Sequence, residues 1–433
     1  MENLLSKEKY FFYSEILREE LVPAMGCTEP IAIAYAAAKA KAVLGKEPQR
    51  AEIAVSGNII KNAKSVVVPH TGGMRGIECA VIAGIAAGNP NAMLEVLSEV
   101  GEADIVSMKK LSETFPVKVV LSDSDNSFDI GVRLFADGDN SFVRITGRHT
   151  NIVCIEKNGE RIFADSDEIS ESSDDKNSKK SNLSVEEIVK FSESVDIERV
   201  RETLDRQIEY NMAIAEEGLS GKWGANIGSV YLSCYKDDIS NKAKAYAAAG
   251  SDARMSGCEM PVIINSGSGN QGITASVPVI VFWREMNLPK ETLYRALCIS
   301  NLVAIHIKYG IGTLSAYCGA VVAGAGAGCG VAYLHGGGFK EIAHTLVNSL
   351  AIVSGVICDG AKASCAAKIS TAVENGLLGF NLYKAGNQFV GGDGIVKKGV
   401  ERTIKSVCRL ANDGMKETDR EILSIMLDEE DNT

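Results

Sequence analysis

Three cysteines in the second half of the chain are the residues best suited to hold a metal. Cys318 lies in SAYCGAVVAG, and Cys358 and Cys365 lie in GVICDGAKASC. Thiolates form in polar, electropositive surroundings, and this second segment supplies Asp359, Lys362 and a turn-permitting glycine. The chain has no close CxxC pair of the kind found in zinc ribbons and ferredoxins. Because free cysteine is also often buried as a small hydrophobic residue, the spacing leaves open both a metal site and simple core packing.

A fourth cysteine, Cys27 in PAMGCTEPIAIA, precedes a helix that Thr28 or Pro30 begins. A thiol near a helix N-terminus has its thiolate stabilised by the helix dipole, so its pKa should fall. The position predicts a base or a nucleophile. It is equally compatible with an ordinary small residue in a turn.

The loop SGSGNQG, Ser266 to Gly272, formally contains a GxGxxG pattern. A dinucleotide site would also need a following helix, another strand and an acidic residue about twenty positions later. Pro278 interrupts the segment that follows, which argues against that site. The loop can still present backbone N–H groups and the amides of Asn270 and Gln271 to a carboxylate. It also faintly resembles the phosphate cradle of pyridoxal-phosphate serine dehydratases, although no nearby lysine suggests itself as a Schiff-base residue.

Another segment, NIIKNAKSVVVPHTGGMRG, contributes Asn58, Lys61, Asn62, His70 and Thr71 at turn-like positions before a glycine-rich helix start. Such a segment can form an anion pocket or simply satisfy its own loop. The remaining histidines show no metal-ligand spacing and are expected to be structural: His149, His306, His335 and His344.

The elements that must position these residues change character along the chain. Helical periodicity covers 8–22, and an alanine-rich helix follows from Pro30 to a cap at Gly45. Strand-like, β-branched segments then dominate to about residue 165, from AEIAVSG, KSVVVP and PVKVVLS to FDIGVRLFAD, SFVRITG and NIVCIEKNGERIF. Helical patterns at 74–87, 91–99 and 103–113 interrupt them.

The polar stretch 165–183 lacks the apolar residues needed to order itself and is expected to be a flexible linker. A capping box, SVEE, then restarts helix at 184–187. The expected fold is α+β, with a mainly α-helical, Gly/Ala-rich catalytic domain at 184–433 and a smaller α+β domain inserted at 46–164. Residues 1–45 are expected to pack with the catalytic domain. The glycine-rich stretch 309–338 is too poor in Leu, Ile, Val and Phe for a membrane span and is expected to be buried helix.

Composition excludes several classes of protein. The 433 residues carry a formal net charge of −11, which argues against a nucleic-acid or anionic-membrane surface. Eleven cysteines and an N-terminus without an apolar leader favour reduced thiols in the cytoplasm. Whether the chain forms a homo-oligomer is left open.

Five motifs, taken together and in order, resemble the L-cysteine desulfidase family, which is related to the α chain of iron–sulfur L-serine dehydratases. They are GCTEPIAIA, SGNIIKNAKSVVVP, SGSGNQG, CGAVVAGAGAGCGVAYLHGG and CDGAKASCAAKI. The resemblance implies an oxygen-sensitive 4Fe–4S cluster held by Cys318, Cys358 and Cys365, with its fourth iron left for substrate. It also implies Cys27 as the proton-transferring residue.

For substrate binding, the resemblance implicates Ser266, Asn270 and Gln271. Two departures from the dehydratases favour the desulfidase branch: the shorter interval in CDGAKASC, and the reduction of a serine-rich SSHT motif to Pro69-His70-Thr71.

The implied chemistry is β-elimination from a small amino acid, L-cysteine, to pyruvate, ammonia and hydrogen sulfide. The open iron would act as a Lewis acid that binds the substrate carboxylate and sulfur, and the Cys27 thiolate would remove the α-proton. Three alternatives remain: L-serine as the substrate, pyridoxal phosphate as the cofactor, and a non-catalytic metal or redox-sensing protein.

Overall fold

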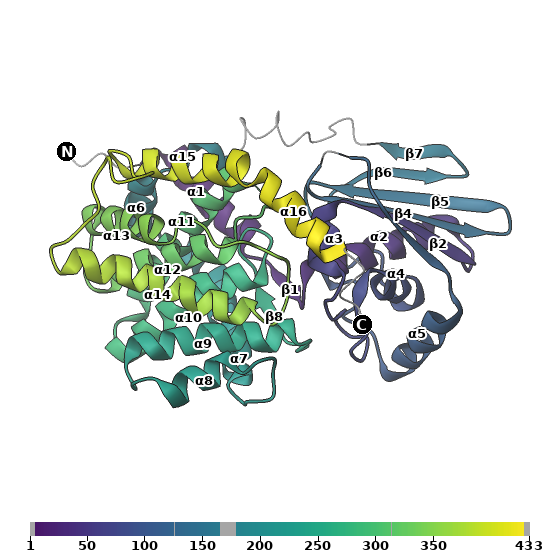
Figure 1. Ribbon diagram of the computed structural model, residues 1–433, viewed down its shortest axis with the longest axis horizontal. Helices are drawn as coiled ribbons and strands as arrows, with labels where there is room; N and C mark the ends of the chain where they lie inside the picture. Colours follow the sequence, from purple (N-terminus) through teal and green to yellow (C-terminus); the bar gives the residue numbers. More distant parts are fainter. Residues whose placement is uncertain (1–4, 125, 165–178, 313, 428–433) are drawn as a thin grey trace.

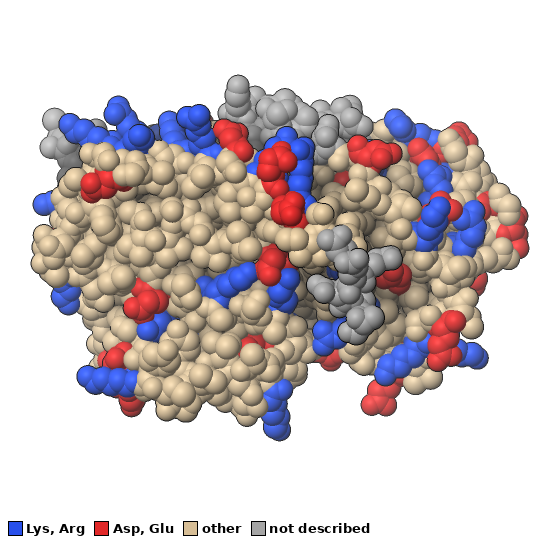
Figure 2. All heavy atoms as spheres, in the orientation of Figure 1, with Lys and Arg blue, Asp and Glu red and all other residues tan. Residues whose placement is uncertain are grey.

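The computed structural model describes residues 5–124, 126–164, 179–312 and 314–427, and it has two lobes (Figure 1). The helical lobe contains α1 and α6 to α15, and the sheet lobe contains α2 to α5 with β2 to β7. Each lobe has its own large cluster of buried apolar side chains. The predicted α+β fold class is confirmed. On the face shown in Figure 2, Lys and Arg side chains lie interspersed with Asp and Glu.

The sheet lobe is built on a mixed sheet that has six strands among the described residues, in the order β3-β2-β4-β5-β6-β7. β2 and β3 are parallel and the other neighbours are antiparallel. Their bounds are β2 (Arg50–Val55), β3 (Val117–Leu121), β4 (Asp129–Ala136), β5 (Asp139–Thr146), β6 (Ile152–Lys157) and β7 (Glu160–Ala164). The predicted KNGE turn joins β6 and β7 in a hairpin, with Asn158 and Gly159 at positive φ.

Helices cover one face of this sheet: α2 (Thr28–Leu44) and α4 (Gly76–Ala87), with α5 (Glu102–Thr114) beyond them. α2 ends at Gly45, whose φ of 72° is readily adopted only by glycine. Nearly every side chain of α2 is buried, so the helix needs apolar neighbours on all sides.

This burial corrects the expectation for residues 1–45. α1 (Lys7–Glu20) packs into the helical lobe, but α2 belongs to the core of the sheet lobe. The physical reason is that β4 and β5 alternate apolar residues toward α2, whose Ala- and Ile-rich segment packs against them.

In the helical lobe, α12 (Gly319–Leu334) packs against α10, α11, α13 and α14. The remaining members are α6 (Val185–Ser194), α7 (Glu198–Gly218), α8 (Ile227–Cys234), α9 (Ile239–Met255), α10 (Gly269–Met286), α11 (Lys290–Ile311), α13 (Phe339–Ile352), α14 (Cys365–Lys384) and α15 (Val400–Arg409). Ser184 caps α6 as predicted, its hydroxyl accepting a hydrogen bond from the Glu187 N–H.

Glycines let α12 and α14 touch backbone to backbone. A Cβ at Gly328 would lie 2.4 Å from the carbonyl oxygen of Gly376, and a Cβ at Gly324 would lie 2.2 Å from that of Ala372. α12 is buried along almost its whole length, as the glycine-rich composition predicted. Within the described part of the chain, no helix combines enough length and hydrophobicity to cross a membrane.

Replacing Gly328 by alanine is therefore expected to destabilise the protein. The helices must separate to admit the methyl group, which costs about 1–3 kcal/mol of unfolding free energy. Gly355→Ala is the matched control, because its nearest neighbour would lie at an ordinary 3.5 Å. Denaturant unfolding measures both variants. Equal stability of the two would contradict the tight helix contact.

Local structure differs from the sequence prediction at four places. Residues 57–63 form a helix, α3 (Gly57–Ala63), where turn-like positions were expected. KSVVVP forms no strand and contributes only an isolated bridge from Val67. In 91–99 the only helix is the short 3₁₀ turn η1 (Met93–Glu95). Pro278 lies inside α10 without ending it.

The two lobes are joined by contacts between segments that are distant in sequence. β1 (Pro23–Met25) pairs with β8 (Pro261–Ile263). The C-terminal helix α16 (Lys416–Leu427) crosses to α3 of the sheet lobe, where Asp419 forms an ion pair with Lys61 at 2.5 Å. Of the predicted linker 165–183, residues 165–178 lie outside the described residues, and 179–182 form the short helix η3 (Lys179–Asn182).

Candidate active site

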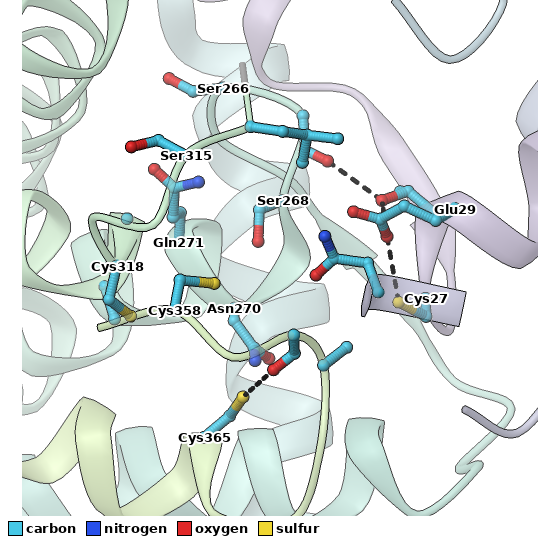
Figure 3. Close-up of a pocket in the computed structure, with 18 of the residues that line it drawn as sticks. Cys27, Glu29, Ser266, Ser268, Asn270, Gln271, Ser315, Cys318, Cys358 and Cys365 are labelled. Atoms are coloured by element: carbon cyan, nitrogen blue, oxygen red, sulfur yellow. Dashed lines mark hydrogen bonds between the residues drawn. The ribbon is translucent and has the colours of Figure 1, made fainter. Parts of the chain in front are cut away.

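Chain segments from both lobes meet around a cavity of about 100 Å³ (Figure 3). The sheet lobe supplies the start of α2 and the end of α3. The helical lobe supplies the SGSGNQG loop, the start of α12 and the segment that leads into α14. Most of these contributors are the N-terminal ends of helices, whose free N–H groups favour negative charge.

The three cysteines in the second half of the chain all line this cavity. Cys318 caps α12, Cys365 begins α14, and Cys358 lies in the loop between α13 and α14. Backbone hydrogen bonds hold two of them side by side: the N–H of Cys318 donates to Val356, and the N–H of Cys358 donates to Ala316. The structure therefore brings together three sulfurs that are dispersed in the sequence.

The surroundings of these thiols favour one thiolate. A hydrogen bond from Cys318 lowers the pKa of Cys358 to about 6, with further help from the Lys61 and Lys308 ammonium groups. The same hydrogen bond, with burial, raises the pKa of Cys318. Burial raises the pKa of Cys365. Lys308 is buried among them, and this burial lowers its own pKa to about 8.

This donor set fits an iron–sulfur cluster. Soft thiolates select such clusters, and two nearby ammonium groups offset the negative charge of the thiolates. Among the described residues, no three His, Cys, Asp or Glu side chains lie close enough together to hold one metal ion. The cysteine ligands of an iron–sulfur cluster need not converge on one metal ion, because they bind different irons of the cluster.

The thiolate can be measured in metal-free, reduced protein. Because the pKa of Cys358 is lowered to about 6, the thiolate absorbance near 240 nm should appear as pH rises through 6. Cys358→Ser should remove that step, whereas Cys234→Ser, at an exposed position, should retain it. A first titration only near the ordinary cysteine pKa of about 8.5 would contradict this assignment.

Cys27 lies across the cavity from the three cysteines and is paired with Glu29 (Figure 3). Its thiol donates a hydrogen bond to Glu29 Oε2 at 3.1 Å, and both side chains are buried. Burial raises the pKa of Cys27 well above its usual value, and the Glu29 carboxylate adds to the rise. The prediction that the helix dipole lowers this pKa is therefore wrong, since desolvation outweighs the dipole.

The Cys27 turn is held by three contacts. β1 leads into it while paired with β8. Gly26 has a φ of 55° and packs so closely on Pro69 that a Cβ would lie 2.3 Å from the ring. The Thr28 hydroxyl donates to the Gly267 carbonyl at 3.1 Å. Cys27 is thus fixed against the SGSGNQG loop.

That loop turns tightly and then begins α10. Ser266 and Gly267 have φ angles of 49° and 78°, and the Ser266 hydroxyl donates to Asn265. Ser266, Asn270 and Gln271 line the cavity. Gln271 packs on Gly319, where a Cβ would lie 2.5 Å from its amide carbon.

The segment around residues 58–71 is only partly at the cavity. Asn62 lines it, but Asn58, one turn earlier in α3, does not. Thr71 is fully buried and donates to the Val68 carbonyl, and His70 Nδ1 lies 3.7 Å from Glu259 Oε2. Asn58, His70 and Thr71 do not line this cavity. That they contact substrate therefore stays a prediction.

The residues that line the cavity and that the sequence did not nominate include Glu29, His149, Arg254, Lys308 and Tyr317. Glu29 could have been found from its place in the GCTEP motif. His149 was expected to be structural. The other three lie in ordinary helical or loop sequence that gives no local signal, and only the packing of the lobes exposes them to the cavity.

Comparison with known proteins supports the resemblance seen in the motifs. Residues 91–424 match the family described as serine dehydratase alpha chain. A UPF0597 protein of Desulfitobacterium hafniense is 57% identical over 97% of each chain. UPF0597 proteins of Lachnoclostridium phytofermentans and Treponema denticola are 51% and 46% identical, covering 95% and 98% of this chain and 98% and 99% of theirs.

Proposed function

The chain belongs to the serine dehydratase α-chain family. On this premise we propose that it is an iron–sulfur lyase acting on L-cysteine. The family indicates lyase chemistry of the dehydratase type. The desulfidase reaction converts L-cysteine and water into pyruvate, ammonia and hydrogen sulfide. L-serine, which would lose water in place of hydrogen sulfide, is the second candidate, because the matching family is that of the serine dehydratases.

One observation carries the proposal: a single cavity has three cysteine thiols on one side and the Cys27–Glu29 pair on the other (Figure 3). A β-elimination needs an electrophile at the leaving group and a base at the α-carbon, on a substrate held between them. A cavity with these two sides has room for a small amino acid but not for a macromolecule.

Cys318, Cys358 and Cys365 would hold a 4Fe–4S cluster. When bound, the cluster would supply a Lewis acid that makes sulfide or hydroxide a better leaving group. The Lys61 and Lys308 ammonium groups favour the thiolate form of Cys358.

On the other side, Cys27 would accept the α-proton once its thiol is ionised. Glu29 fixes the direction of the sulfur through the 3.1 Å hydrogen bond, and Arg254 is the nearby charge that favours the thiolate. Loss of the α-proton and of sulfide leaves aminoacrylate, which tautomerises to an imine and is hydrolysed to pyruvate and ammonia.

The test is one assay on two substrates. Protein purified and reconstituted without oxygen should contain about four irons and four sulfides per chain, and should form pyruvate with equimolar sulfide from L-cysteine. Faster pyruvate formation from L-serine would select the dehydratase reaction instead. Pyruvate from neither substrate, in protein that holds its iron, would refute the proposed function.

A further inference from the structure

The cavity contains buried polar atoms that no protein group satisfies. Among the described residues, four such atoms without a hydrogen-bond partner belong to side chains that line it: His149 Nε2, Arg254 Nε, Gln271 Oε1 and Tyr317 OH. Leaving a buried donor or acceptor unpaired is costly. Their gathering around one cavity indicates a polar ligand that completes their hydrogen bonds.

Arg254 is the most informative of these residues. It is 4% exposed and lies at the end of α9. Its Nη1 donates a hydrogen bond to Asn270 Oδ1 at 3.1 Å. No carboxylate of the described residues lies within ion-pair distance of it. A buried guanidinium with a free Nε has the geometry to bind a carboxylate with two parallel hydrogen bonds.

The fold makes room for this guanidinium. A Cβ at Gly269 would lie 2.3 Å from Arg254 Nε, so only glycine at the start of α10 allows the side chain to lie there. Arg254 also acts electrostatically on both Cys27 and Cys365. It lines the same cavity as both thiols, within which a substrate would lie.

We propose that Arg254 binds the carboxylate of the substrate, so that the site selects α-amino acids over amines that lack a carboxylate. Asn270 orients the guanidinium by accepting its Nη1 hydrogen bond. This inference rests on the proposed function for the class of substrate, but it gives a substrate-binding role to Arg254, which lies outside the sequence motifs.

The test measures binding as well as turnover. Reconstituted enzyme is titrated calorimetrically with L-alanine, which has no leaving group, and with ethylamine, which is alanine without its carboxylate. Wild-type enzyme should bind L-alanine and not ethylamine. Arg254→Gln should raise the Kd for L-alanine about 10- to 150-fold and raise KM for L-cysteine similarly, with iron content unchanged.

Two further variants make the outcome decisive. Arg284→Gln removes an exposed arginine of α10 that pairs with Glu216, and it should change nothing. Arg254→Lys retains the charge but not the planar fork, so it should also weaken L-alanine binding, and it decides the matter if Arg254→Gln does not fold.

Unchanged L-alanine affinity in a folded Arg254 variant would overturn the inference and leave the lyase function standing. So would equal binding of ethylamine and L-alanine by wild-type enzyme, or no binding of either. Arg254-dependent L-alanine binding without pyruvate from any substrate would instead refute the lyase function alone.

Discussion

Cys27→Ala is expected to lower turnover by about 10²- to 10⁴-fold, the usual contribution of a general base, while the protein keeps its iron. Turnover and iron binding should be affected separately, because the Cys27 thiol is hydrogen-bonded to Glu29 and lies across the cavity from the other three thiols. Pyruvate formation and iron content are measured on the same preparation.

Cys298→Ala is the matched control, since Cys298 is equally buried but lies within α11, away from the cavity. It should retain both iron and turnover. Near wild-type turnover in Cys27→Ala would remove Cys27 from the reaction.

The same assignment predicts the pH dependence. A raised Cys27 pKa means that the thiol is protonated at neutral pH, so the fraction of active base, and with it kcat/KM, should increase as pH rises. Glu29→Gln removes both a negative charge and the carboxylate acceptor, each of which raises that pKa. The increase in kcat/KM should therefore occur at lower pH in this variant. An unshifted profile would mean that a group other than Cys27 titrates.

Alanine at any of Cys318, Cys358 or Cys365 is expected to abolish cluster binding, and with it turnover. Loss of a residue that merely supports a metal ligand already lowers metal affinity or activity about 10- to 100-fold. Loss of a ligand itself should lower cluster binding further. Iron and sulfide analysis, together with the visible absorption of the reconstituted protein, measures the outcome.

The control for this series is Cys329→Ala. Cys329 lies within α12, which Cys318 precedes, and its buried thiol donates a hydrogen bond to the Ile342 carbonyl. It should bind iron as the wild type does. Full iron content in a Cys358→Ala protein would contradict the proposed ligand set.

Much of the local structure followed from the sequence. Period-two and period-3.6 patterns, the Gly45 cap and the Ser184 capping box predicted most helices and strands, because these signals act over a few neighbouring residues. α3 and the Pro278 position in α10 were missed, since a short helix and a buried proline depend on surrounding packing rather than on local propensity. The motifs nominated eight of the residues that line the cavity.

The sequence by itself nominated the candidate base and the candidate cluster ligands, and it predicted that α12 is buried. Both predictions rest on thiol chemistry and small-residue composition, which are properties of single residues and short segments. Only the tertiary structure decided that the Cys27 thiol is buried and hydrogen-bonded to Glu29. It also decided that Arg254 and Lys308 border the cavity and that His70 does not. Those facts depend on the pairing of β1 with β8 and on burial between two lobes. Desolvation and the field of distant charges act through space, so no pattern along the chain encodes them.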